Sequence, residues 1–292
     1  LLKINLLLLY YILRKKGREK QHFVKKSCTK RAVFLHLHKW IFHDIIYKKF
    51  FGGIMPKFFV NGEQVQNNKV IIIGEDVNHI KNVLRMKKQN KLIICNTENN
   101  MNYNCIIESI EKKEIVCKII ENLGSNSETN CNIHLFQGLP KADKMEYIIQ
   151  KTTELGVKRI IPVKMERCVG KINDKDKINK IDRWRKIAEV AAKQSQRDTI
   201  PVIGEIIKLN DINIDKYDVF IIAYEKEKNI SIKNLLQKNK QSKNIGILIG
   251  PEGGINEKEI KLLQEKGGKL VSLGERILRT ETAPIALISM II

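Results

Sequence analysis

Short apolar runs separated by polar turns make up the chain from residue 55 to about residue 124. The runs recur roughly every ten residues with Asn and Gly between them, a spacing typical of strands in a small β-barrel. They cover 58–60, 70–73, 91–95, 103–110 and 115–120. One helical pattern at 76–85 interrupts them and places Val77, Ile80, Val83 and Leu84 on one face. We therefore predict a small β-barrel domain with one helical insertion over residues 55–124.

The pattern changes after a polar linker at 123–130 (LGSNSETN), which is the predicted domain boundary. Over 131–292 short apolar strands alternate with helical periods. The predicted strands are 133–138, 159–163, 219–223, 245–249 and 270–273, and the predicted helices are 141–155, 178–196 and 257–266. Gly156 is expected to end the first helix, and Asn256 with Glu259 to cap the last. This alternation predicts an α/β fold with a mainly parallel sheet covered by helices.

Residues 1–54 differ from the rest of the chain in both pattern and charge. They open with an apolar stretch at 4–13 that is too short to span a bilayer, and they hold 13 Lys/Arg against 2 Asp/Glu. Gly52 and Gly53 stand just before Met55, and a ribosome-binding site read in frame would encode such a glycine pair. We expect translation to begin at Met55 and 1–54 to be mostly upstream sequence, with a targeting leader or a basic functional arm as alternatives.

Charge and reactive residues narrow the possible chemistry. The formal net charge is +21, and the part after residue 54 still holds 40 Lys/Arg against 30 Asp/Glu. A basic body favours a polyanionic partner, although Lys- and Asn-rich usage also fits an AT-rich genome. The six cysteines are scattered, and only His79 and His134 lie beyond residue 54, so we expect no metal site and a reducing compartment. Neither H-E-x-x-H nor G-x-S-x-G occurs, which removes the usual signs of metal hydrolysis and serine chemistry.

Two glycine-bearing turns near the C terminus form the candidate binding site. The first is GPEGG at 250–254, and the second runs from Leu273-Gly274 to an Arg-Thr-Glu-Thr cluster at 279–282. Each follows an apolar strand, so each lets the backbone approach a ligand closely at the end of that strand. Neither turn matches the dinucleotide or triphosphate loop, and Pro251 removes one N–H donor. Taken alone, GPEGG is either a rigid ligand site or a structural turn.

In combination, GPEGG and LG-x-R-ILRTETA resemble the RsmE-type SPOUT RNA methyltransferases. Further matches occur in the family's order along the chain. They are His79 with VLR at 83–85, KME at 144–146, ELGV at 154–157, ERC at 166–168 and WRKIA at 184–188. The resemblance extends from Met55 to Ile292 and has no counterpart for residues 1–54.

The resemblance implies both a fold and an activity. Members of this family methylate N3 of a uracil in small-subunit ribosomal RNA, with S-adenosyl-L-methionine as the cofactor. Their α/β domain threads a C-terminal trefoil knot, a rare exception to unknotted topology, and a PUA-like barrel helps to hold the RNA. They usually act as homodimers. The implied location is the bacterial cytoplasm, or an organelle if 1–54 is a genuine leader, with no membrane partner.

The resemblance also assigns roles to individual residues. Catalytic roles fall to Arg279, Glu281 and Thr282, with Arg279 expected to stabilise negative charge on the uracil while its proton leaves to water or Glu281. Cofactor contacts are expected from Ile249, Gly250, Pro251, Gly253, Gly254, Leu273, Gly274, Ile277 and Leu278. RNA contacts are expected from Arg85, Lys141, Lys144 and Arg167.

Each role has a plainer alternative. Ile277 and Leu278 would also suit core packing, Glu281 a helix N-terminal acid and Arg167 a surface salt bridge. Arg85 would also suit a solvated helix face, and Lys141 with Lys144 a solvated basic face. At the level of the whole chain, the alternatives are a SPOUT ribose 2′-O-methyltransferase acting on transfer or ribosomal RNA, and an RNA-binding protein without catalytic activity.

Overall fold

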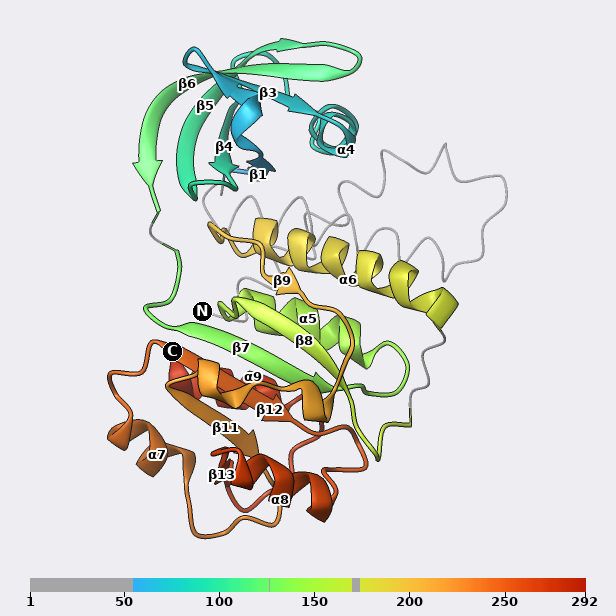
Figure 1. Cartoon of the computed structure of the whole chain (residues 1–292). Helices are drawn as coiled ribbons and strands as arrows, with labels where there is room; N and C mark the ends of the chain where they lie inside the picture. The colour runs from blue at the N-terminus through green and yellow to red at the C-terminus, as the bar shows by residue number, and fades with distance from the viewer. Residues whose placement is uncertain (1–54, 126, 170–173) are drawn as a thin grey trace, which may run out of the picture. The chain divides into compact units, whose positions relative to one another are not determined.

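The computed structural model describes residues 55–125, 127–169 and 174–292 (Figure 1). The predictions made for residues 1–54 therefore lie outside the described residues. Two β-sheets occupy the described part of the chain, one formed before residue 125 and one after residue 131.

The first sheet has six strands in the order β1-β4-β5-β6-β3-β2. Their bounds are β1 Lys57–Val60, β2 Val65–Gln66, β3 Lys69–Ile73, β4 Lys91–Asn96, β5 Met101–Ile110 and β6 Glu114–Gly124, with a short 3₁₀ helix, η2 Gly62–Gln64, before β2. Strand β1 runs parallel to β4, and the other neighbours are antiparallel. Along β3 the buried Val70 and Ile72 alternate with exposed Ile71 and Ile73, as expected for a strand with one face in a core. The five predicted strands are confirmed, and β2 is added.

The helical insertion of the first sheet is shorter and wider than predicted. It consists of α4 Glu75–Asn78 followed by a π-helical turn, η3 His79–Val83, closed by the N–H of Leu84 donating to the carbonyl of His79. Val77 and Ile80 are buried, but Val83 is 62% exposed, so its predicted place on the apolar face is wrong. The physical reason is that each i→i+5 turn holds one residue more than an α-helical turn and rotates the positions that follow.

The second sheet is entirely parallel, which confirms the predicted α/β class. Its path is β10-β8-β7-β12-β11-β13, and β9 also pairs with β8. The strands are β7 Asn132–Gly138, β8 Arg159–Lys164, β9 Val202–Ile203, β10 Ile207–Lys208, β11 Val219–Ala223, β12 Asn244–Ile249 and β13 Lys269–Val271. Strand β12 thus lies between β7 and β11 although it follows both in the sequence.

Five α-helices accompany this sheet in the described residues. They are α5 Lys144–Glu154, α6 Asp174–Gln194, α7 Ile232–Lys238, α8 Glu257–Glu265 and α9 Ala283–Ile291, and two 3₁₀ turns, η4 Leu209–Asp211 and η5 Ile214–Lys216, precede β11. The predicted cap of α8 is confirmed, because Asn256 and Glu259 form a reciprocal capping box. Gly156 ends the α5 region with φ +93°, as predicted. Ile178 of α6 is 69% exposed, and the helix begins four residues before the predicted start at 178.

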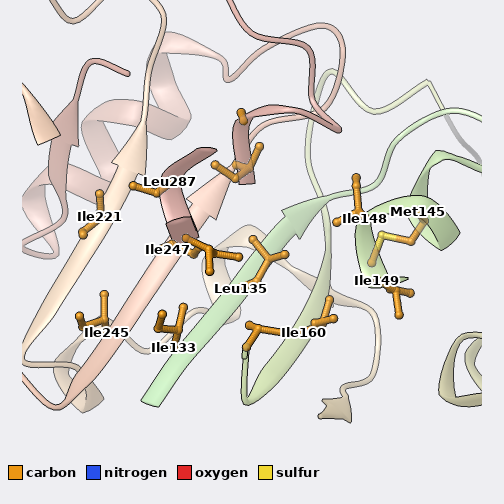
Figure 2. Close-up of a cluster of buried hydrophobic side chains, with 14 of the residues drawn as sticks. Ile133, Leu135, Met145, Ile148, Ile149, Ile160, Ile221, Ile245, Ile247 and Leu287 are labelled. Atoms are coloured by element: carbon orange, nitrogen blue, oxygen red, sulfur yellow. The ribbon is translucent and has the colours of Figure 1, made fainter. Parts of the chain in front are cut away.

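Both faces of the second sheet are buried. On one face, apolar side chains of the strands pack against helices α5 and α9 (Figure 2). The strand residues are Ile133, Leu135, Ile160 and Ile247, and the helix residues are Met145, Ile148 and Ile149 of α5 and Leu287 of α9. On the other face neighbouring positions of the same strands, such as Phe136 and Leu248, pack with Ile260 and Leu263 of α8. Burial on both faces explains the near-continuous apolar runs that mark these strands in the sequence. None of the described helices is both long and apolar enough to cross a membrane.

A buried polar network holds the linker between the two sheets. Arg197 follows α6 and donates to the carbonyls of Thr153 and Val157 at the end of α5, and its guanidinium pairs with Glu128 at 2.6 Å. Burial alone would raise the pKa of the Glu128 carboxyl, but hydrogen bonds from Arg197 and Lys158 lower it to about 2. Charged side chains therefore hold the polar linker that the sequence predicts.

The carboxylate of Asp198 extends this network to the first sheet. It accepts hydrogen bonds from the ammonium of Lys57 in β1 at 2.6 Å and from the amide of Asn102 in β5 at 2.7 Å. It also accepts from the Ser125 hydroxyl and the Ser127 N–H. Burial is the largest single effect and raises the pKa of this carboxyl, but hydrogen bonds from Lys57, Ser127 and Asn102 together outweigh it and lower the pKa.

We predict that Glu128→Gln lowers the free energy of unfolding by about 3 kcal/mol, because it leaves the buried Arg197 charge without its partner. Urea unfolding of the two proteins measures the difference. Asp182→Asn, which removes an exposed ion pair with Arg185 on α6, is the matched control and should cost no more than about 1 kcal/mol. Equal effects of the two substitutions would contradict the role given to Glu128.

The same pair predicts a dependence on pH. The ordinary pKa of a glutamate is 4.5 and that of folded Glu128 is about 2, so its stabilising effect is complete above about pH 4.5 and is lost as the pH falls toward 2. The difference in unfolding free energy between the wild type and Glu128→Gln should shrink across that window. A difference that stays constant from pH 6 to pH 3 would count against the buried charge pair.

Candidate active site

Three neighbouring strands end at one edge of the second sheet and line one cavity. Strands β11, β12 and β13 are parallel and adjacent, so their carboxyl ends meet there (Figure 1). The cavity has a volume of about 540 Å³, within the range of small-molecule sites. Segments 223–225, 249–255 and 272–280 form most of its wall.

The first glycine turn is tightly closed. A side chain at Gly250 would place its Cβ 2.8 Å from Ile255, and Gly254 has φ +70° and donates its N–H to the carbonyl of Pro251 at 2.9 Å. A Cβ at Gly254 would lie 2.8 Å from the Glu225 carboxylate, which comes from the end of β11. Helix α8 begins directly after the turn. Close backbone packing therefore requires glycine in this turn.

The second turn is more open toward the cavity. Gly274 has φ +120°, and a Cβ built there would meet nothing within 4 Å. Its N–H donates to the Ser272 hydroxyl at 3.2 Å, which shapes the start of the turn. Ile277 is 82% exposed, whereas Leu278 is partly buried against the core. Open backbone beside an exposed apolar side chain is suited to a flat ligand with both polar and apolar parts.

A buried hydroxyl joins the two turns. Thr280 is 6% exposed, donates to the carbonyl of Gly250 at 2.7 Å and accepts from the side-chain amide of Gln137 at 3.0 Å. Gln137 is the next-to-last residue of β7 and is fully buried. Its Oε1 atom has no hydrogen-bond partner among the described residues. This chain of bonds fixes the second turn against the central strands of the sheet.

Charged side chains gather beside the cavity. The ammonium of Lys144, the first residue of α5, lies 3.0 Å from Glu252 of the first turn and 3.3 Å from Glu281 of the second. The hydrogen bond to Glu252 and the negative charges of both glutamates raise the pKa of Lys144. Burial opposes ionisation of Glu252, but its own backbone N–H and the Lys144 ammonium outweigh it and lower the pKa of that carboxyl.

The reacting groups predicted from the sequence lie close together. Arg279 is exposed and lines the cavity, and its carbonyl accepts from the N–H of Thr282, the residue that caps α9. Glu281 and Thr282 do not line the cavity themselves but occupy the same tight turn. All nine residues predicted to contact the cofactor do line it.

The predicted RNA contacts are more widely spread. Arg167 donates to the carbonyl of Gly253 at 3.2 Å and so lies against the first turn. The backbone N–H of Lys141 donates to the Glu252 carboxylate. The side chain of Lys141 is exposed and takes no part in that hydrogen bond. Arg85 lies directly after the π-helical turn of the first sheet, exposed and with φ +53°. Only Lys144 among the four lines the cavity.

Sequence reasoning missed the third wall of the cavity. Ala223 ends β11, and Tyr224 and Glu225 follow it; all three line the site, but no glycine marks them. The sequence did predict the strand at 219–223. In a parallel sheet its carboxyl end lies at the same edge as the ends of the two strands that precede the glycine turns. That inference needed the strand order, which the sequence does not state.

Comparisons with known proteins identify the class to which the chain belongs. Residues 127–292 match the family model described as RNA methyltransferase domain, and residues 72–120 match the model described as RNA methyltransferase PUA domain. The fold and the site thus define an RNA methyltransferase.

Full-length relatives narrow the class. The ribosomal RNA small subunit methyltransferase E of Bacillus subtilis is 38% identical, and the match covers 81% of this chain and 96% of that protein. Its counterpart in Mesomycoplasma hyopneumoniae is 34% identical over 80% of this chain and 98% of its own length. The chain belongs to the ribosomal RNA small subunit methyltransferase E family.

Two solved structures show the same fold with a ligand. A Legionella pneumophila methyltransferase in complex with S-adenosylmethionine is 30% identical, with a TM-score of 0.74 and coverage of 82% of this chain and 97% of its own. A Neisseria gonorrhoeae ribosomal RNA small subunit methyltransferase E bound to S-adenosylmethionine is 29% identical, with a TM-score of 0.72 and coverage of 81% and 96%.

We predict that Gly250→Ala weakens S-adenosylmethionine binding at least about tenfold, or about 1.4 kcal/mol, because the added Cβ would press on Ile255 and displace the first turn. Isothermal titration calorimetry measures the affinity. Gly204→Ala is the control, since its Cβ would make only ordinary contacts, the nearest at 3.4 Å from Ile161. Unchanged affinity in Gly250→Ala would show that this turn does not bind the cofactor.

Proposed function

We propose that the chain transfers a methyl group from S-adenosylmethionine to N3 of a uridine in small-subunit ribosomal RNA. The observation that carries the proposal is the cavity at the joined ends of β11, β12 and β13, with the exposed guanidinium of Arg279 in its wall. Family membership supports the reaction class, and the names of the relatives support the substrate.

The residues of the cavity suit this cofactor. Backbone groups of Gly250 and Gly274 offer donors and acceptors to an adenine and a ribose, while Ile249, Ile277 and Leu278 supply apolar surface. Three glutamates and three cationic side chains line the cavity, so its charges balance, and neither turn carries the lysine-bearing loop that binds a triphosphate. When bound, S-adenosylmethionine supplies an electrophilic methyl group.

The chemistry asks two things of the protein. The uracil must be held with N3 in line with the methyl group, so positioning contributes much of the rate. N3 must also lose its proton, which leaves negative charge on the adjacent uracil oxygens. Arg279 is placed to stabilise that charge, and the proton leaves to water or to Glu281. Thr282 donates its N–H to the carbonyl of Arg279 and thereby shapes the turn that presents the guanidinium.

RNA binding is assigned to both parts of the chain. We assign residues 55–124 to a PUA-like barrel that holds RNA and residues 131–292 to the catalytic domain, in agreement with the two family models. Arg85, Lys141 and Arg167 are the proposed phosphate contacts. Exposed side chains at Arg85 and Lys141, and the place of Arg167 beside the first turn, support these assignments.

The proposal extends to topology and assembly. The segment after β13 returns from the sheet edge to reach Gly250, as expected for a trefoil knot. Helices α5 and α9 pack together in the core, and Tyr147 and Met290 on them remain 48% and 44% exposed, which favours a homodimer through these helices. Activity on ribosomal RNA would place the protein in the bacterial cytoplasm or in an organelle with a bacterial-type ribosome.

Mass spectrometry of small-subunit ribosomal RNA tests the function. We expect a deletion strain to lack one N3-methyluridine and to regain it when the gene is restored. N3 methylation blocks the base-pairing edge and stops reverse transcription, whereas a ribose 2′-O-methyl group protects the neighbouring phosphate from alkaline cleavage. Loss of a 2′-O-methyl group instead would favour the other SPOUT chemistry, and no change would favour an RNA-binding protein without catalysis.

We predict that Arg279→Ala lowers turnover at least about 100-fold, the usual effect of removing one group that stabilises developing negative charge. Methyl transfer to small-subunit RNA at saturating cofactor measures it, and calorimetry should show unchanged affinity for S-adenosylmethionine. Arg185→Ala, at an exposed arginine of α6, is the control and should retain full turnover. Near-normal turnover of Arg279→Ala would contradict the assigned role.

A further inference from the structure

Lys144 lies between the two turns that form the site. Its ammonium is 3.0 Å from Glu252 in the first turn and 3.3 Å from Glu281 in the second, and its side chain is 35% exposed. We infer that Lys144 is a positioning residue that holds the Glu281 carboxylate at the reaction centre, and not a contact to an RNA phosphate. This inference rests on the proposed methyl transfer, because it assigns Glu281 a part in that reaction.

The charge balance around Lys144 explains why a lysine begins this helix. A cation at a helix N terminus is unfavourable for the helix dipole, which from the sequence alone suggests a phosphate partner. In the structure two glutamates already provide the opposing charge. An ammonium has three N–H donors, and both carboxylates lie within its reach, so a phosphate would have to displace one of them.

Glu281 depends on Lys144 for its place. Its side chain is only 19% exposed, and its Oε2 atom is buried without a hydrogen bond of good geometry from any described residue. Lys144 at 3.3 Å therefore acts on this oxygen by charge attraction. Without it, Glu281 would face Glu252 with no cation between the two, and repulsion would turn one carboxylate toward solvent.

The same geometry leaves Glu281 able to act. Lys144 lies against the buried Oε2 atom, so the second carboxylate oxygen, Oε1, keeps its capacity to accept a proton or a hydrogen bond. Arg279 stands two residues earlier in the same turn. The cation thus fixes the direction of the carboxylate while an acceptor site next to Arg279 remains available to the substrate.

Lys144→Met tests the inference, because it removes the charge and keeps most of the apolar stem. We expect turnover at saturating RNA and cofactor to fall about 10-fold to 100-fold, less than the roughly 100-fold to 10,000-fold contribution of a general acid or base itself, because Lys144 acts through Glu281. Affinities for RNA and for S-adenosylmethionine should stay within about twofold of the wild type, and so should the salt dependence of RNA binding. Lys144→Arg keeps the charge and should recover most of the turnover.

A phosphate contact would behave differently. It would weaken RNA binding, lower the slope of log affinity against log salt by about 0.7 to 0.9, and leave turnover at saturating RNA unchanged. That result would overturn the inference. Lys144→Gln, which also removes the charge but keeps a polar side chain, keeps the test decisive if Lys144→Met is poorly folded: reduced turnover with unchanged RNA affinity supports the inference, and unchanged turnover with weaker, less salt-dependent RNA binding contradicts it.

A double-mutant cycle identifies the residue through which Lys144 acts. If its effect passes through Glu281, Lys144→Met should lower turnover less than twofold further in a Glu281→Gln background. Independent, multiplicative losses would contradict the inference. The two proposals can fail separately. A wild-type chain that leaves ribosomal RNA unmethylated refutes the proposed function. An active wild type with full turnover in Lys144→Met refutes only the role of Lys144.

Discussion

The hydroxyl of Thr280 is the contact on which the site depends. It bonds the carbonyl of Gly250 and the side chain of Gln137, and so ties the turn after β13 to the ends of β12 and β7. The strand order makes this contact possible, because β12 lies between β7 and β11 and its end is reached by a segment that leaves the sheet at β13. Together with the ion pairs from Lys144 to Glu252 and Glu281, that bond connects the two glycine turns and fixes Arg279 and Glu281 beside the cavity.

Charged pairs also connect distant segments of the chain, at the linker and beside the cavity. Arg197, Glu128 and Asp198 form a buried network at the linker, where each charge is matched and further hydrogen bonds come from the backbone. The partly exposed Lys144 pairs in a similar way with one glutamate in each glycine turn. In both places a cation joins segments that are distant in sequence, so that polar groups instead of apolar contacts fix the parts of the chain that must be accurately placed.

Sequence patterns predicted most of the elements because burial leaves a clear period. The parallel strands read as apolar runs, and the glycine turns were visible because closely packed backbone at Gly250 and positive φ at Gly254 and Gly274 require glycine. Val83 was misplaced because a π-helical turn has a different period. The wall at 223–225 and the pairing of Lys144 could not be predicted, since both depend on which strand ends become neighbours in space.

The central claim is that three strand ends far apart in the sequence form one cofactor site. Hydrogen–deuterium exchange of the full chain, with and without S-adenosylmethionine, tests it most directly, because amides that contact or are ordered by a ligand exchange more slowly. The account predicts slower exchange in three segments together: 223–225, 250–255 and 273–280. Protection confined to one turn, or protection elsewhere with none at these segments, would contradict it.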